Sequence, residues 1–151
     1  MHETAISTLN DLIHLDIDAI HAYRQAIDAC EIAEVRTQLA SFMADHERHV
    51  TDLEGAVRGI GGVPAAGRDL KGFFIEGFTA IMSRGDRTAL IAMRGNEEVT
   101  TRRYEAALRA NLSDEARTLV EKNHADEVRH LAWIKDAIDR KIWESHRGKA
   151  A

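Results

Sequence analysis

Proline and cysteine each occur only once in this chain of 151 residues, and aromatic residues make up 5% of it. The single cysteine, Cys30, excludes an intramolecular disulfide framework. No apolar run approaches the length of a membrane span, and the opening MHETAISTLNDL lacks the charged-then-apolar pattern of a secretion signal. These absences predict a soluble, cytoplasmic protein that has no membrane partner.

The chain also lacks a concentration of positive charge. Its net charge is −5, and the 20 basic residues are interspersed with 25 acidic ones. Proteins that bind nucleic acid gather lysine and arginine on one face or along one helix, where they meet the phosphates. The composition therefore argues against nucleic acid as a partner.

Good helix formers dominate what is present, above all Ala, Leu, Glu and Arg. The apolar periodicity predicts an all-α fold with four long helices, at about 4–29, 34–60, 86–110 and 114–143. Asp86 and Ser113 are the predicted N-caps of the third and fourth helices. Short connections make each successive pair an antiparallel hairpin, so 1–151 is a single four-helix bundle.

A long crossover, residues 61–85, joins hairpin one (about 4–60) to hairpin two (about 86–143). It opens with GGVPAAGRDLKG, whose glycines and proline interrupt the helical pattern. FFIEGFTAIM (73–82) follows and is predicted to form a short fifth helix with three of the four phenylalanines. This apolar segment would cap the bundle or form the contact of a homodimer.

One six-residue phrase occurs twice, as DHERHV at 45–50 and as DEVRHL at 126–131, an offset of 81 residues. The same offset, without gaps, aligns apolar positions in both helices of each hairpin. It also pairs Asp16 with Glu97. The chain is therefore interpreted as an internal repeat, in which two related hairpins form a bundle with pseudo-twofold symmetry.

Six ionisable residues interrupt the apolar stripes of the four helices at mid-height. They are Asp16, His46, His49, Glu97, Glu127 and His130. Burying such groups without partners costs roughly several kcal/mol each. Because they are predicted to converge at one level, they must satisfy one another, and a metal ion does this best.

Seven further residues are candidates to support this site through hydrogen bonds: Asp45, Asp126, Arg48, Arg129, Tyr23, Tyr104 and His124. Asp126 lies four residues before His130, which suits a carboxylate that fixes the tautomer of that imidazole. The tyrosines could hydrogen-bond the ligands or relay an electron, and they could equally be core aromatics with satisfied hydroxyls. A core role is equally open for His124.

Two acidic residues beside the predicted ligands are alternatives. Asp18 is expected on a solvated face with His14 and His21, and it replaces Asp16 as a candidate ligand if the first helix is rotated. Glu98 is rotated about 100° from Glu97 around its helix and is expected at the surface, or as a mobile ligand.

The chain resembles the ferritin-like diiron-carboxylate superfamily in three features. They are the D-E-x-R-H phrase, a carboxylate on each of the other two helices, and paired hairpins with a long crossover. That superfamily includes rubrerythrins, bacterioferritins and bacterial diiron oxygenases. The resemblance covers about residues 4–143. In the superfamily the first and third helices each supply a carboxylate, and the second and fourth each supply Glu-x-x-His. Carried over to this chain, those ligands are Asp16, His49, Glu97, Glu127 and His130.

The sequence departs from the superfamily at His46, where a bridging glutamate is expected, and at Asp16, which is shorter than the usual glutamate. The implied ligand set becomes three carboxylates and three imidazoles in place of four and two. Two iron ions are favoured, with manganese as an alternative or as part of a Mn/Fe pair. A mononuclear site, a loosely held pair, or zinc, which accepts nitrogen-rich shells, also stays open.

The resemblance implies a non-haem metal protein, leaning towards an oxidoreductase, whose partners are metal ions and small oxidants. A dinuclear site would react with oxygen or peroxide. No cysteine-rich segment could form a rubredoxin-like electron donor, which favours a ferroxidase- or peroxidase-type reaction. The alternative is a metal-binding or metal-free bundle without enzyme activity and with a stress-related role.

Overall fold

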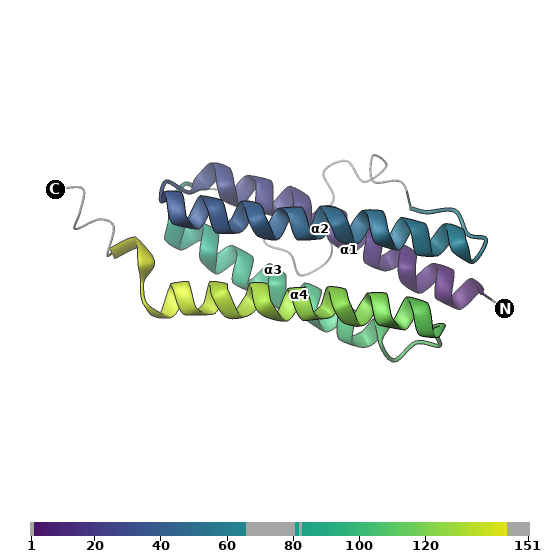
Figure 1. Cartoon of the computed structure of the whole chain (residues 1–151). Coiled ribbons are helices and arrows are strands. Elements are labelled where there is room, and N and C mark those ends of the chain that lie inside the picture. The colour runs from purple at the N-terminus through teal and green to yellow at the C-terminus, as the bar shows by residue number, and fades with distance from the viewer. Residues whose placement is uncertain (1, 66–80, 82, 145–151) are drawn as a thin grey trace.

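The computed structural model describes residues 2–65, 81 and 83–144. Its four helices are α1 (Glu3–Ala29), α2 (Ala33–Gly59), α3 (Asp86–Ala107) and α4 (Asp114–Asp139). The α1–α2 hairpin and the α3–α4 hairpin lie side by side in one elongated bundle (Figure 1). The all-α class and the four long helices are thus confirmed. The predicted fifth helix, apart from Ile81, lies outside the described residues.

Three predicted helix ends are wrong, and one of them is the end of α3, which lies at Ala107 and not near residue 110. Asp86 is the first residue of α3, and Gly85 occupies its N-cap position. The Asp86 carboxylate instead accepts hydrogen bonds from the backbone N–H groups of Glu31 and Ile32, at 2.9 and 3.1 Å. It therefore ties the start of the second hairpin to the α1–α2 turn, where otherwise unpaired N–H groups at the start of α2 need acceptors.

The fourth helix begins as predicted and ends early. The Ser113 hydroxyl accepts a hydrogen bond from the Ala116 N–H at 3.2 Å, as an N-cap should. α4 ends at Asp139, and Lys141 then adopts a positive φ of 47° that a continuing α-helix does not allow. The apolar pattern continues beyond this point, which explains why the sequence predicted a helix as far as residue 143.

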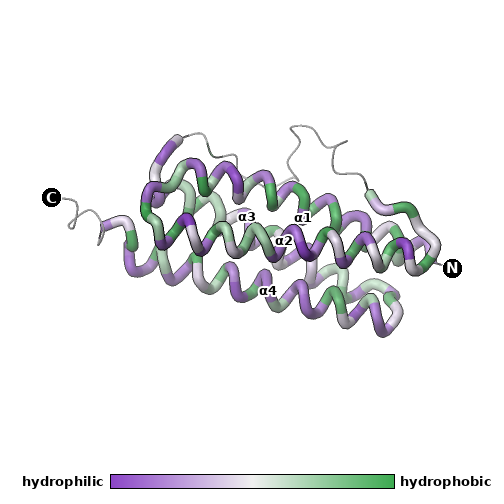
Figure 2. Tube along the Cα trace, turned by 45° about the horizontal axis from the view of Figure 1, so that its top comes forward, coloured by the Kyte–Doolittle hydropathy of each residue, from purple (hydrophilic) through white to green (hydrophobic). Residues whose placement is uncertain are grey.

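The core consists of two apolar clusters with a polar layer between them. One cluster includes Leu39, Phe42 and Ile134, and the other includes Leu9 and Val120. Apolar and polar residues are interspersed along every helix (Figure 2), and buried residues recur at spacings of three to four, so that they lie on the side of each helix that packs on this core. Among the described helices, none has an apolar stretch long enough to cross a bilayer.

Candidate metal centre

The polar layer contains the six ionisable residues that the sequence singled out. Asp16 comes from α1, His46 and His49 from α2, Glu97 from α3, and Glu127 and His130 from α4. Each is at most 1% exposed. The structure therefore brings the three carboxylates and three imidazoles together in the interior, as the sequence predicted; their role as metal ligands stays a prediction.

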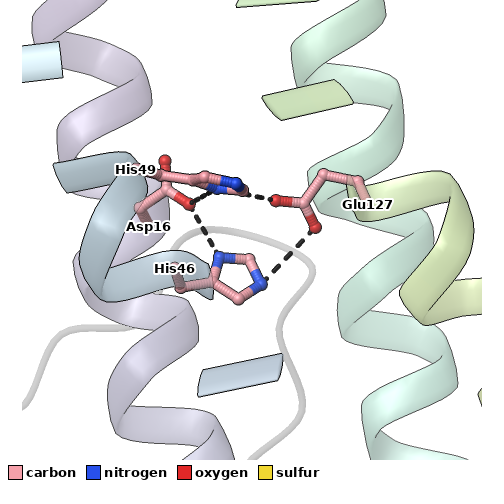
Figure 3. A group of neighbouring side chains, drawn as sticks. All are labelled: Asp16, His46, His49 and Glu127. Atoms are coloured by element: carbon pink, nitrogen blue, oxygen red, sulfur yellow. Dashed lines mark hydrogen bonds and ion pairs between the residues drawn. The ribbon is translucent and has the colours of Figure 1, made fainter. Parts of the chain in front are cut away.

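His46 lies at the middle of this layer and reaches all three carboxylates. Its Nδ1 is 2.7 Å from Asp16 Oδ1, and its Nε2 is 3.1 Å from Glu97 Oε1 and 3.5 Å from Glu127 Oε2. Figure 3 shows the imidazole between Asp16 and Glu127, with His49 on the same side as Asp16. The histidine that replaces the expected bridging glutamate therefore occupies the centre of the site.

The six residues form two overlapping groups in which the possible ligand atoms all lie within 4.8 Å of one another. The Asp16 group consists of Asp16, His46, His49 and Glu127, and the Glu97 group consists of His46, Glu97, Glu127 and His130. Each group offers two nitrogens and two carboxylates, a donor set suited to divalent iron, manganese or zinc. His46 and Glu127 belong to both groups.

The two outer histidines are held by aspartates of the opposite helix. His49 Nε2 lies 2.9 Å from Asp126 Oδ2, and His130 Nε2 lies 2.8 Å from Asp45 Oδ2. The predicted partnership of Asp126 with His130 on its own helix is therefore wrong. α2 and α4 run antiparallel (Figure 1), so residue 45 stands opposite residue 130 and residue 49 opposite residue 126. The inward-turned imidazole of each helix therefore reaches an aspartate of the other helix.

Two arginines complete this connection between α2 and α4. Arg48 contacts the carboxylate of Asp126 and lies 3.2 Å from Asp45, while Arg129 lies 2.6 Å from Asp45 and 3.2 Å from Asp126. The arginines are partly exposed, at 40% and 52% of their side chains. Their main effect is to fix the two aspartates that orient the imidazoles, since ion pairs at this exposure add about 1 kcal/mol or less.

The two tyrosines are crossed in the same way between α1 and α3. Tyr23 donates its hydroxyl hydrogen to Glu97, and Tyr104 donates to Asp16 Oδ2 at 2.5 Å. Burial and the adjacent carboxylate charges raise the pKa of both hydroxyls well above the ordinary value. Both tyrosines therefore stay protonated and act as donors that orient the carboxylates.

Two polar residues of the site were not among the candidates from sequence. The Thr100 hydroxyl lies 2.9 Å from Glu97 Oε2 and 3.0 Å from Glu127 Oε2, so it can donate to either carboxylate. The Asn123 amide donates to the Tyr104 hydroxyl at 3.3 Å. Thr100 and Asn123 each lie about one turn from a predicted ligand on the same helix face, and that spacing was the available signal.

Contacts with the carboxylates raise the pKa values of all three imidazoles. Although burial opposes protonation, the carboxylates of Asp16 and Glu127 raise the pKa of His49 to about 9, and those of Glu127 and Glu97 raise that of His130 to about 9. The pKa of His46 is raised well above its usual range against the same burial effect. Without a metal ion, protonated imidazoles therefore balance the buried carboxylates.

The layer nevertheless retains polar atoms that no hydrogen bond satisfies. In the described part of the chain, Glu127 Oε1 and His130 Nδ1 are buried and make no hydrogen bond; their ion-pair contacts are long, 3.5 Å to His49 Nδ1 and 3.4 Å to Glu97 Oε1. Both atoms belong to residues of the two groups, and a carboxylate oxygen and an imidazole nitrogen are metal-ligand types. Unsatisfied buried polar atoms are rare and costly, so these two atoms fit a site that accepts an ion.

Two other residues lie where the sequence did not place them. Asp18 is 3% exposed, so the expected solvated position is wrong; Leu15 and Ala22, one turn on either side of it, are buried as well. α1 packs against both α2 and α3 and therefore buries a wider face than one stripe. His124 Nε2 lies 3.5 Å from Glu105 Oε1, beside α3.

The crossed contacts make a testable prediction about Asp126. Asp126→Asn should disturb the imidazole of His49, across the bundle, far more than that of His130 on the same helix. We expect metal affinity to fall by roughly 10–100-fold, as is usual for carboxylates that orient ligand histidines. The ¹⁵N chemical shifts of labelled histidines measure the first effect, and Asp45→Asn is the matched control that should disturb His130 instead. Equal changes at both histidines in both variants would contradict the crossed arrangement.

The fold and the buried set of carboxylates and imidazoles define the class: a ferritin-like four-helix bundle with possible metal-binding residues at its centre. A crystal structure of ferritin like, diiron-carboxylate proteins from Bacillus anthracis str. Ames is similar to this chain, with a TM-score of 0.72 and 22% sequence identity. The match covers 88% of this chain and 94% of that one, and it establishes the fold.

The chain belongs to the family described as Domain of unknown function (DUF2383), which matches residues 4–110. The matched segment includes α1, α2 and α3, with Asp16, the two α2 histidines and Glu97. α4, with Glu127 and His130, lies beyond it. A comparison with curated proteins gives no match.

Proposed function

We propose that this protein is a non-haem iron protein that binds up to two ions in the polar layer and reacts with dioxygen or hydrogen peroxide. The supporting observation is the pair of overlapping ligand groups, in which all six side chains are buried at one level of the bundle. Manganese or a mixed Mn/Fe pair would suit the same donors. The ferritin-like fold adds support, because such bundles carry dimetal sites in their cores.

The chain's own residues supply negative charge, orientation and protection from water. Three carboxylates attract divalent cations into an interior where unpaired charge is unfavourable. Asp45 and Asp126 hold the outer imidazoles through Nε2, so that each Nδ1 faces the centre. Burial keeps bulk water away from the ligands and strengthens their electrostatic interactions.

The proposed reaction is oxidation of ferrous iron. Bound ferrous iron would supply one electron per ion, so that two ions and two protons reduce hydrogen peroxide to two waters, and four ions and four protons reduce dioxygen to two waters. Tyr23 and Tyr104 hold Glu97 and Asp16 in place by hydrogen bonds while the charge at the site changes. The Thr100 hydroxyl can do the same for either Glu97 or Glu127.

One observation favours a second candidate, a bundle that functions without metal. His46 contacts all three carboxylates, and three protonated imidazoles can balance their charge without an ion. This internal neutralisation would suit a helical bundle with a structural role under stress. The two candidates differ in whether the purified protein takes up metal with useful affinity.

The test is anaerobic loading with ferrous iron, followed by metal analysis and exposure to oxygen or peroxide. We expect at least one bound equivalent and a ferric absorption band that develops on exposure, with peroxide consumed in the ratio given above. Less than half an equivalent of iron, manganese or zinc after loading would exclude the metal hypothesis and favour the metal-free bundle. Bound iron that is not oxidised would leave a metal-binding protein without ferroxidase activity.

A further inference from the structure

The two ligand groups differ in how ready they are to accept an ion, and His46 is the origin of the difference. Its Nδ1 faces Asp16, and its Nε2 faces Glu97 and the shared Glu127. A neutral imidazole has one N–H and one lone pair, so it can be a ligand on only one side. The other ring nitrogen then presents a hydrogen to the opposite group, which suits a carboxylate and disfavours a cation.

The contact distances indicate which nitrogen keeps its hydrogen. His46 Nδ1 lies 2.7 Å from Asp16 Oδ1, whereas Nε2 lies 3.1 and 3.5 Å from its two carboxylate neighbours, Glu97 and Glu127. The shorter contact is the stronger charge-assisted hydrogen bond. His46 therefore keeps the hydrogen on Nδ1 and offers the lone pair of Nε2 to the Glu97 group.

The outer histidines show the same bias. His49 has carboxylate oxygens at both ring nitrogens, Asp16 at 3.0 Å from Nδ1 and Asp126 at 2.9 Å from Nε2, so both nitrogens act as donors. His130 donates from Nε2 to Asp45, while its Nδ1 makes no hydrogen bond among the described residues and lies 3.4 Å from Glu97 Oε1. A metal ion can therefore replace the proton on His130 Nδ1 without breaking a hydrogen bond, whereas at His49 it must break one.

Packing fixes His130 as well. Its ring stacks on Phe42, with the ring centroids 4.3 Å apart and the planes at 28°. The residue that stands 81 positions after Phe42 is Asn123, which instead hydrogen-bonds the Tyr104 hydroxyl. The two halves of the layer are thus unlike: an aromatic ring packs on His130, whereas the equivalent position of the other hairpin carries an amide.

Asp16 is held by imidazoles more closely than Glu97, its counterpart on α3. Asp16 Oδ1 accepts from His46 at 2.7 Å and His49 at 3.0 Å, and Oδ2 accepts from Tyr104. Glu97 accepts from the hydroxyls of Tyr23 and Thr100, and its imidazole contacts are longer, 3.1 Å to His46 Nε2 and 3.4 Å to His130 Nδ1. An ion in the Asp16 group must therefore displace shorter imidazole contacts than an ion in the Glu97 group.

We infer that the centre fills in two unequal steps, with the first ion held by His46 Nε2, Glu97, Glu127 and His130 Nδ1. Asp16 is then a positioning residue that holds the Nδ1 hydrogen of His46, and it becomes a ligand only for a second, weaker ion. This inference rests on the proposed metal-binding function and specifies how the ligand groups are used. It also assigns the effect of His46: histidine here separates two binding steps that a bridging carboxylate would join.

Equilibrium titration of the metal-free protein with Co²⁺, followed by its visible absorption, tests the order of filling. We expect one tight equivalent and a second that binds at least tenfold more weakly. His130→Gln should weaken the first step by 100-fold or more. The matched variant His49→Gln, at the equivalent position of the other hairpin, should leave the first step within about threefold of wild type and remove the second. Circular dichroism establishes that both variants keep their helices.

Histidine nitrogen spectra provide a readout that a general loss of folding does not mimic. In ¹⁵N-histidine-labelled protein with one equivalent of Zn²⁺, we expect metal at Nε2 of His46 and at Nδ1 of His130, with a hydrogen on His46 Nδ1. His49 should keep the shifts that it has in the metal-free protein. His46→Glu should bring the two Co²⁺ binding steps to within about threefold of each other.

Three results would overturn the inference while leaving the proposed function intact. They are two equivalents of equal affinity in the wild-type protein, a first step that His49→Gln weakens as much as His130→Gln, and zinc at His49 in the one-equivalent spectrum. The absence of any bound Co²⁺ or iron in the wild-type protein would instead defeat the proposed function itself. The two failures are therefore distinguishable in the same titration.

Discussion

Glu127→Ala should abolish tight metal binding in both ligand groups, because Glu127 is one of the two residues that the groups share. We expect the affinity for the first ion to fall by more than about 100-fold, beyond the loss that follows removal of a residue that only orients a ligand. Ferric absorption on exposure to oxygen or peroxide should disappear. Metal analysis after anaerobic loading, followed by absorption spectroscopy, measures both effects.

Two further variants make this result specific. Glu127→Gln keeps the side-chain shape and removes the charge, so it should lose metal in the same way even if the alanine variant folds poorly. Glu121→Ala removes an exposed glutamate from the same helix and should bind metal like the wild type. Metal content in Glu127→Gln equal to that of the wild-type protein would show that this carboxylate is not a ligand.

Metal loading should raise the melting temperature, and the rise should grow as the pH increases from about 6.5 to 9. At a ligand concentration 100 times the Kd, stabilisation is about 2.7 kcal/mol. For a domain of this size that corresponds to an increase of roughly 5–10 °C in Tm. Differential scanning calorimetry with and without Zn²⁺ at several pH values measures the rise.

The pH trend follows from the imidazoles. The pKa values of His49 and His130 are raised to about 9 in the metal-free folded protein, from the ordinary value of 6.5. Their protonation therefore stabilises the metal-free protein fully below pH 6.5, and this stabilisation is lost as the pH rises through 9. Metal binding requires neutral imidazoles and releases their protons, so metal affinity increases over the same range.

The matched comparison uses the Glu127→Gln variant, in which added Zn²⁺ should leave Tm nearly unchanged at every pH. A chelator should return the wild-type Tm to its metal-free value. A Zn²⁺-induced rise that shrinks between pH 6.5 and 9 would contradict the assignment of the imidazoles as ligands.

The positions of Asp16 and the α2 histidines were predictable because each interrupts an apolar stripe of its helix, and the spacing of 3–4 residues places it on the buried face. Asp18 was not predictable in the same way. It lies off the single stripe, and it is buried because α1 packs against two neighbours. A stripe read from one helix cannot show how many neighbouring helices cover it.

The duplicated phrase also led to residues of the polar layer, but the hydrogen-bond partners of its side chains could not be predicted from the sequence. Sequence spacing favoured Asp126 with His130, four residues apart on one helix. In the structure His130 bonds to Asp45, and Asp126 bonds to His49. Thr100 and Asn123 lay within the right periodicity, but their contacts depend on which carboxylate stands opposite.

By itself, the sequence determined the four helices and the six ligand-type residues at mid-height, because both follow from helix propensity and a period of 3.6 residues. Only the tertiary structure decided which side chains contact one another. The aspartates and tyrosines reach residues of the opposite hairpin, and the two nitrogens of His46 face Asp16 and Glu97. The physical reason is that these contacts depend on the register of antiparallel helices and on side-chain rotamers, which packing of the whole bundle sets.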